Sequence, residues 1–203
     1  MPLTSLLPLL EAAEARRATA LGLVCLGWED AVAYVRAGEA TGVPVILQAG
    51  PSARRHIPVR VWGAIFRELG EGASVNVVAH LDHGASPEEC FEALDAGFTS
   101  VMFDGSKLPL AQNISETERM LTRAKSYGAS TEAEIGFVGY AEGAASKGTD
   151  PDEARAFHDA APVDCLAVSV GNVHLHMEQA VALDFDLLDE MVAAVHCPLV
   201  LHG

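Results

Sequence analysis

The sequence predicts an α/β protein, a (β/α)8 TIM barrel, with the chain stopping after about the seventh strand. Short apolar runs alternate with helical patterns along the whole chain. The runs recur about every 20 to 35 residues, the size of one βα unit. Their apolar character on both faces is typical of a buried parallel sheet. No dinucleotide fingerprint follows the first run, which disfavours a Rossmann fold.

The expected strands share short length and apolar composition. In chain order they are Ala20–Leu26, Val43–Gln48, Val75–Leu81, Ser100–Phe103, Ser130–Ile135, Cys165–Val170 and Pro198–Leu201. No linker, low-complexity tract or composition shift divides them, so we expect one barrel domain over residues 1–203.

The expected helices carry start and stop signals, mainly a capping residue, a proline at the first position and a glutamate three residues after the cap. Glycine then ends the helix in the left-handed conformation. The signals are Ser86, Pro87, Glu89 and Gly97 in one helix, Asp150, Pro151 and Glu153 in a second, and Ser115, Glu118 and Gly128 in a third. The segment "FDLLDEMVAAV" predicts a further amphipathic helix.

Composition excludes several classes of function. The 28 acidic and 13 basic residues give a net charge of −15, which disfavours nucleic acid and anionic membranes as partners but allows a small anionic substrate. No apolar run reaches the ~18 residues of a membrane span. Four scattered cysteines without a C-x-x-C pair and no visible signal peptide predict reduced, buried thiols in a cytoplasmic protein.

Polar residues end five of the expected strands. They are His80, Asp82 and His83 at the end of the third strand, Asp104 after the fourth, Glu132 and Glu134 on the fifth, Gly171, Asn172 and His174 after the sixth, and His202 and Gly203 after the seventh. Barrels of this class build their chemistry at the carboxyl ends of the strands. The sequence therefore predicts a site at this end.

Three histidines from three strands can meet where the strands converge, and neutral imidazoles suit zinc with one position left open for substrate. Asp82, beside a ligand, could accept and return a proton. Alternation puts His80 and Asp82 on one side and His83 on the other. His83 reaches a metal only if the chain turns, which Gly84 permits. We expect His80 to be structural.

Glu132 and Glu134 share one strand face. Two close carboxylates need a cation or a shared proton, and Asp104 could complete a second cation site there.

The segments "HLDHG", "SVMFDGSKLPLAQNI", "STEAEIG", "LAVSVGNVH" and "PLVLHG" resemble the zinc-dependent class II aldolases, especially the fructose- and tagatose-bisphosphate branch. The resemblance runs from about Val43 to the last residue. It implies that His83, His174 and His202 bind zinc, that Asp82 handles the hydroxyl proton, and that Asp104 and Glu134 offer second-cation or alternative metal positions. It further implies that Glu142, in the loop "GFVGYAEGAASKG", moves the proton on the carbon nucleophile, and that Gly171, Asn172 and Gly203 contact substrate.

The resemblance implies an enzyme of carbohydrate metabolism that cleaves a phosphorylated ketose reversibly. Zinc, with a second divalent or monovalent cation as a further expectation, would stabilise the enediolate as a Lewis acid. The implied partners are a sugar phosphate substrate and other copies of the chain, in a dimer or tetramer.

Several positions depart from the family pattern. Leu175 and Tyr140 stand where the family has glycine, and the first strand lacks the usual Phe-Asn pair. Arg54 and Arg55 predict either a clamp for phosphate or carboxylate or solvated surface side chains. The chain ends before the expected glycine-serine loop and eighth strand, so we expect a longer protein, or else dependence on a partner.

Two other functions stay open. One is a metal-dependent hydrolase on the same barrel, against which Glu142 and Asp82 argue. The other is a non-catalytic relative, which Leu175 and the altered first strand favour.

Overall fold

The computed structural model describes residues 3–140, 145–175 and 182–203. The chain forms two compact units: unit 1 comprises residues 1–103 and 120–131, and unit 2 comprises residues 104–119 and 132–203. Each unit is described by itself.

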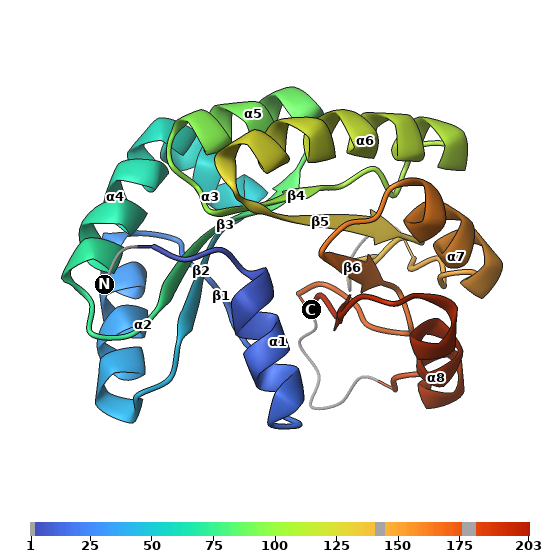
Figure 1. The fold of residues 1–203 in the computed structure, drawn as a ribbon, viewed down its shortest axis with the longest axis horizontal. Helices are drawn as coiled ribbons and strands as arrows, with labels where there is room; N and C mark the ends of the chain where they lie inside the picture. Colours follow the sequence, from blue (N-terminus) through green and yellow to red (C-terminus); the bar gives the residue numbers. More distant parts are fainter. Residues whose placement is uncertain (1–2, 141–144, 176–181) are drawn as a thin grey trace. The chain divides into compact units, whose positions relative to one another are not determined.

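Unit 1 consists of successive βα units (Figure 1). Its elements are α1 (Leu7–Ala15), β1 (Gly22–Val24), α2 (Trp28–Thr41), β2 (Val45–Ala49), α3 (Pro51–His56), α4 (Val59–Gly72), β3 (Val77–Gly84), α5 (Pro87–Asp95) and β4 (Ser100–Phe103). Strands β1 to β4 are parallel and follow chain order. The C-terminal part of α6 (Leu110–Tyr127) and the first two residues of β5 (Ser130–Ile135) also belong to this unit.

The core of unit 1 lies between the sheet and helices α2, α4 and α5. Trp62 and Phe66 of α4 are fully buried. Their ring centroids lie 5.3 Å apart, and the Phe66 ring meets Phe98 edge to face at 5.6 Å. Strand β3 is buried along almost its whole length, as expected for a parallel strand covered on both faces.

Unit 2 contains the N-terminal part of α6, the rest of β5, α7 (Pro151–Ala160), β6 (Cys165–Val168), α8 (Phe185–Ala194) and β7 (Leu199–Val200). Strands β5, β6 and β7 are parallel neighbours in chain order. Helices α7 and α8 pack together, and Phe157 of α7 and Met191 of α8 are fully buried.

The fold prediction is confirmed: all seven expected strands are present and separated by helices, and the strands within each unit are parallel. Two of the predicted caps form as expected, since Ser86 Oγ accepts the Glu89 N–H at 3.2 Å and Asp150 accepts the N–H groups of Asp152 and Glu153. Gly97 and Gly128 are left-handed, with φ of +94° and +63°.

The predicted start of the third helix is wrong. Helix α6 begins at Leu110 rather than after Ser115, because the Pro109 carbonyl already accepts the N–H groups of Gln112 and Asn113. Extending the helix by this turn also buries the Asn113 side chain.

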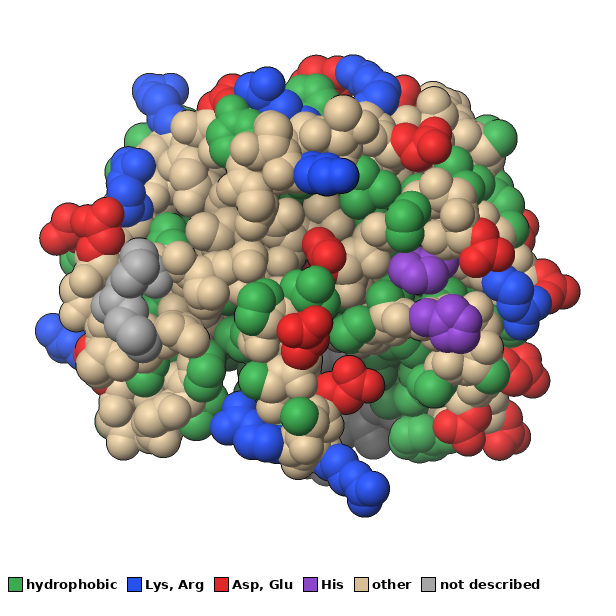
Figure 2. Space-filling model, in the orientation of Figure 1, with side chains coloured by type: hydrophobic (Ala, Val, Ile, Leu, Met, Phe, Trp, Pro, Cys, Tyr) green, Lys and Arg blue, Asp and Glu red, His purple; other side chains and the backbone are tan. Residues whose placement is uncertain are grey.

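The face of the molecule in Figure 2 carries acidic and basic side chains interspersed with hydrophobic ones, and no single basic patch gathers there. Within the described residues, no helix combines the length and the apolar character that crossing a membrane requires.

Candidate active site

The end of strand β3 turns at His83. This residue is left-handed, with φ of +50°, a conformation that costs a non-glycine residue about 1–2 kcal/mol. The β3–β4 register shifts between Leu81 and Gly84. The turn that the sequence assigned to Gly84 is therefore made by His83 itself. Gly84 has another role, because an added Cβ would lie 2.7 Å from the Met102 carbonyl oxygen.

Three polar side chains of β3 have distinct surroundings. His80 is buried, and its Nδ1 lies 2.8 Å from Ser100 Oγ, which agrees with the structural role expected of it. Asp82 is 6% exposed, and its Oδ1 lies 4.0 Å from His83 Nε2. Asp82 Oδ2 lies 3.1 Å from the point where a Cβ on Gly50 would stand. A side chain at position 50 would therefore crowd the Asp82 carboxylate.

In unit 2, His202 is paired with a buried carboxylate. Its Nε2 lies 2.9 Å from Glu132 Oε1, and the two side chains are 7% and 3% exposed. The other carboxylate oxygen, Oε2, accepts from Cys165 Sγ at 3.6 Å. With Nε2 protonated and donating to Glu132, the lone pair of the imidazole lies on Nδ1. The sequence placed Glu132 beside Glu134 around a cation and missed this pairing.

Asn172 links the ends of β6 and β7. Its Oδ1 accepts the Val170 N–H at 2.9 Å, and its Nδ2 donates to the His202 carbonyl at 2.7 Å. The preceding Gly171 has φ of +95°, and a Cβ there would lie 2.6 Å from the Ala182 carbonyl oxygen. The Asn172 side chain thus holds the backbone of His202. The substrate contacts expected of Gly171 and Asn172 stay predictions.

The His174 ring has two other rings as neighbours. Its centroid is 5.0 Å from that of Tyr140 and 5.9 Å from that of His202. The backbone N–H of His174 donates to the Gly139 carbonyl at 2.8 Å. This bond connects His174 to the segment that contains Tyr140. Leu175 follows in the left-handed region, with φ of +54°, and is 73% exposed.

The remaining acidic residues expected at the site also lie in unit 2. Glu134 is buried, and its Oε1 accepts the Val138 N–H at 3.2 Å. Asp104 Oδ1 accepts the Ser106 hydroxyl at 2.6 Å. Their role toward a second cation stays a prediction. Glu142 lies outside the described residues, and Gly203 is exposed.

The two arginines after β2 differ sharply. The Arg54 side chain is 5% exposed and pairs with Glu89, whereas Arg55 is exposed and bonds Ser52 Oγ at 3.2 Å. Arg54 therefore fits neither the anion clamp nor the solvated side chain that the sequence allowed.

Burial keeps the cysteines protonated. It raises the pKa of the Cys25, Cys90 and Cys197 thiols to about 12, and it raises the pKa of Cys165 well above the ordinary value with the help of the Glu132 charge. All four are free thiols, as the sequence predicts; Cys25, Cys90 and Cys165 are buried, whereas Cys197 is only partly buried.

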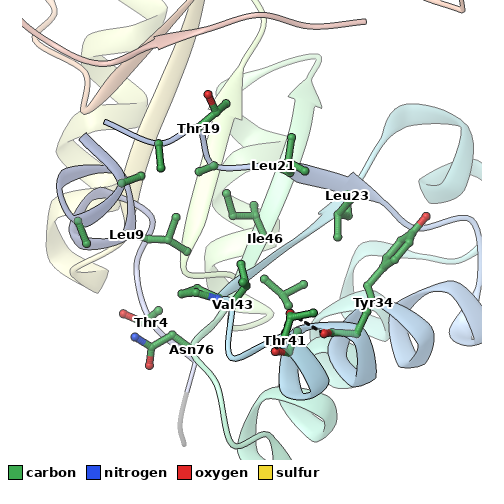
Figure 3. Close-up of a pocket in the computed structure, with 18 of the residues that line it drawn as sticks. Thr4, Leu9, Thr19, Leu21, Leu23, Tyr34, Thr41, Val43, Ile46 and Asn76 are labelled. Carbon is green, nitrogen blue, oxygen red and sulfur yellow. Dashed lines mark hydrogen bonds between the residues drawn. The ribbon is translucent and has the colours of Figure 1, made fainter. Parts of the chain in front are cut away.

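A separate cavity of about 550 Å³ lies in unit 1, away from these residues. Figure 3 shows side chains of α1, β1 and α2, among them Leu9, Leu23 and Tyr34, around it. None of the residues expected to hold metal or substrate lines it.

The imidazoles of unit 2 suit zinc. Two imidazoles on one tetrahedral zinc, with Zn–N bonds of about 2.0–2.1 Å, have centroids about 5 Å apart, close to the spacing of His174 and His202. A carboxylate behind a ligand histidine is the usual outer partner in zinc sites, and Glu132 holds this position. The residues present therefore fit the metal.

Comparison with known proteins gives the family. The family model described as "Fructose-bisphosphate aldolase class-II" matches residues 4–203. The chain belongs to the class II fructose-bisphosphate aldolase family. Its match includes both units.

Relatives within this family are aldolases by name. The 6-phospho-5-dehydro-2-deoxy-D-gluconate aldolase of Shouchella clausii is 38% identical over 87% of this chain and 62% of that protein. The probable fructose-bisphosphate aldolase of Bacillus subtilis is 36% identical over 100% of the chain and 74% of that protein. The Staphylococcus aureus fructose-bisphosphate aldolase is again covered over only 62% of its length. The chain thus spans about three fifths to three quarters of these class II relatives.

Solved structures of this family agree in fold. The crystal structure of the YdjI aldolase from Escherichia coli K12 matches 99% of the chain and 72% of that protein with a TM-score of 0.87 and 28% identity. A putative fructose-1,6-biphosphate aldolase from Coccidioides immitis matches 97% of the chain and 72% of that protein with a TM-score of 0.86 and 30% identity.

Proposed function

We propose that this chain carries the catalytic face of a zinc-dependent aldolase that reversibly cleaves a phosphorylated ketose. The observation that carries the proposal is His202, held by the buried carboxylate of Glu132 beside His174, in a chain that matches the class II family over residues 4–203. A carboxylate that orients one imidazole next to a second imidazole is typical of a metal site.

In this proposal three histidines hold zinc: His174 and His202 of unit 2, and His83 of unit 1. His83 is supported by its place at the carboxyl end of a parallel strand, where barrels of this class assemble their sites. Bound there, zinc would supply Lewis acidity for the negative charge that develops on the ketose oxygens. Asp104 and Glu134 are the proposed ligands of a second cation.

Asp82 is the proposed acid and base for the hydroxyl proton. It lies one residue before a proposed ligand, is nearly buried, and lies close to Gly50, where a Cβ would stand 3.1 Å from its Oδ2. A carboxylate in such a place can take the hydroxyl proton as the carbon–carbon bond breaks and return it in the reverse direction. Glu142 is proposed to move the proton on the carbon of the ketose half.

The substrate class follows from the relatives. The names of the relatives in Shouchella, Bacillus and Staphylococcus describe aldolases of phosphorylated sugars or sugar acids. We extend this class to the present chain, with Gly171, Asn172 and Gly203 near the substrate. We further propose a cytoplasmic enzyme that assembles as a dimer or tetramer.

A cleavage assay tests the proposal. The purified protein is given fructose bisphosphate, tagatose bisphosphate or free fructose, and triose phosphate release is followed with a coupled dehydrogenase. We expect release from at least one bisphosphate and none from free fructose. A chelator should abolish release, and added zinc should restore it. Failure to cleave either bisphosphate in a zinc-loaded sample would contradict the proposed function.

A second candidate is a non-catalytic relative that retains the metal. Tyr140 covers one side of His174, and the exposed Leu175 follows it, so both glycines of the family pattern are replaced by large side chains at one ligand. Zinc binding without turnover in the same assay would favour this candidate. If Y140G and L175G together then restored cleavage, the two side chains would be the cause.

A further inference from the structure

The Arg54 guanidinium lies under the end of β3 in unit 1. It comes from the short helix α3, and its side chain is 5% exposed. Nη1 donates to the carbonyl oxygens of Ala49 and Asp82, and Nη2 donates to the His83 carbonyl at 2.9 Å. Nε donates to Glu89 Oε1 at 2.8 Å. The guanidinium thus donates to three backbone carbonyls and one carboxylate.

Two of these carbonyls belong to the irregular part of β3. The β3–β4 register breaks between Leu81 and Gly84, and Asp82 and His83 lie in that interval. Arg54 donates to both of these carbonyl oxygens. The planar fork of a guanidinium suits this task, since it presents several donors in fixed directions.

Glu89 connects the same guanidinium to the chain after the turn. Its Oε1 accepts from Arg54, while its Oε2 accepts the Ala85 N–H at 2.8 Å. Glu89 is itself fixed in the first turn of α5, where Ser86 caps its N–H. The turn at His83 is therefore held from β2, from α3 and from α5.

We propose that Arg54 is a positioning residue, which fixes the left-handed turn at His83 and so aims the His83 imidazole and the Asp82 carboxylate. The proposal rests on the proposed function for its use of His83 and Asp82. Arg54 acts through their backbone carbonyls and does not contact substrate. Its neighbour Arg55, exposed and bonded to Ser52, offers a matched control.

The test measures zinc affinity by chelator competition, together with kcat and KM, in the holoenzyme and its variants. R54A should weaken zinc binding about 10–100-fold, the range found when an outer partner of a metal ligand is removed. Its kcat should fall more than its KM rises. R54K should weaken zinc binding similarly, because one ammonium cannot reproduce the fork. R55A should match the wild type.

V59A separates positioning from general loss of stability, because Val59 is buried in α4 of the same unit. It should lower the unfolding midpoint and leave zinc affinity unchanged. Equal zinc loss in V59A and R54A would overturn the proposal, as would zinc affinity in R54A within twofold of the wild type. If R54A does not fold, R54K takes its place in the test. Zinc affinity in R54K within twofold of the wild type would then overturn the proposal. H83A distinguishes a failure of the positioning proposal from a failure of the proposed zinc site. Unchanged zinc affinity in H83A would refute the zinc site itself.

Discussion

The substitution E132Q tests whether a buried carboxylate tunes a zinc ligand. Glu132 Oε1 lies 2.9 Å from His202 Nε2, and neither side chain is more than 7% exposed. Glutamine keeps the shape and one acceptor oxygen but removes the negative charge. The exchange therefore isolates the charge from the packing.

The expected magnitude follows from the change in hydrogen-bond type. A hydrogen bond to a charged group contributes about 1.5–3 kcal/mol, and a neutral one about 0.5–1.5 kcal/mol. The difference is about 1–1.5 kcal/mol, and each ~1.4 kcal/mol is tenfold in a binding constant. Because solvent does not screen this buried pair, we expect most of the difference to appear as a zinc dissociation constant raised about five- to tenfold.

Competition with a chromogenic chelator measures this change directly in the folded variant. E116Q provides the control, since Glu116 pairs with Arg119 on the exposed face of α6; its zinc affinity should equal that of the wild type. Zinc affinity in E132Q within twofold of the wild type would show that the carboxylate does not act on the ligand, and the assignment of His202 to the metal would lose its main support.

Three further predictions rest on other parts of the chain. D82A should retain zinc while turnover falls about 10²–10⁴-fold; loss of zinc in a metal analysis would instead make Asp82 a ligand or a structural residue. L175G should raise the free energy of unfolding in urea by about 0.5–1 kcal/mol, because relief of the left-handed strain outweighs the greater freedom of glycine in the unfolded chain; a decrease would mean that the leucine makes stabilising contacts. Because burial raises the pKa of Cys25 and Cys90 to about 12, their thiols stay protonated at about pH 8, and a thiol reagent should label them only after denaturation; rapid labelling of the native protein would contradict this.

The strands could be predicted closely from the sequence. Ser100–Phe103 and Ser130–Ile135 occur with the expected bounds and are buried along their whole length, as is typical of parallel strands covered on both faces. In the second strand two glutamates interrupt the apolar pattern. Helix starts depend on weaker signals. Ser115 resembles a cap, yet the residues from Leu110 onward are equally compatible with helix, and packing of Asn113 decides where α6 begins.

Partners of buried charges could not be predicted in the same way. Glu132 and Glu134 share a strand and alternate with apolar residues, so the sequence treats them alike. In the structure Glu132 pairs with His202, which is 70 residues away, whereas Glu134 accepts a backbone N–H from Val138. The partners of Arg54 could not be predicted either, since they are backbone carbonyls, which every residue has.

The clearest failure of local rules occurs at the proposed ligands themselves. Among the described residues, left-handed conformations without glycine occur at Arg17, His83 and Leu175. One of these is a proposed zinc ligand, and another directly follows a second ligand, His174. Such conformations are costly and persist where the surroundings enforce them, which is why they gather at functional sites. At His83 the enforcing group is identifiable as the buried Arg54 fork. Leu175 is largely exposed, so little packing can offset the cost there, and its exchange for glycine should separate a stability cost from a contribution to function.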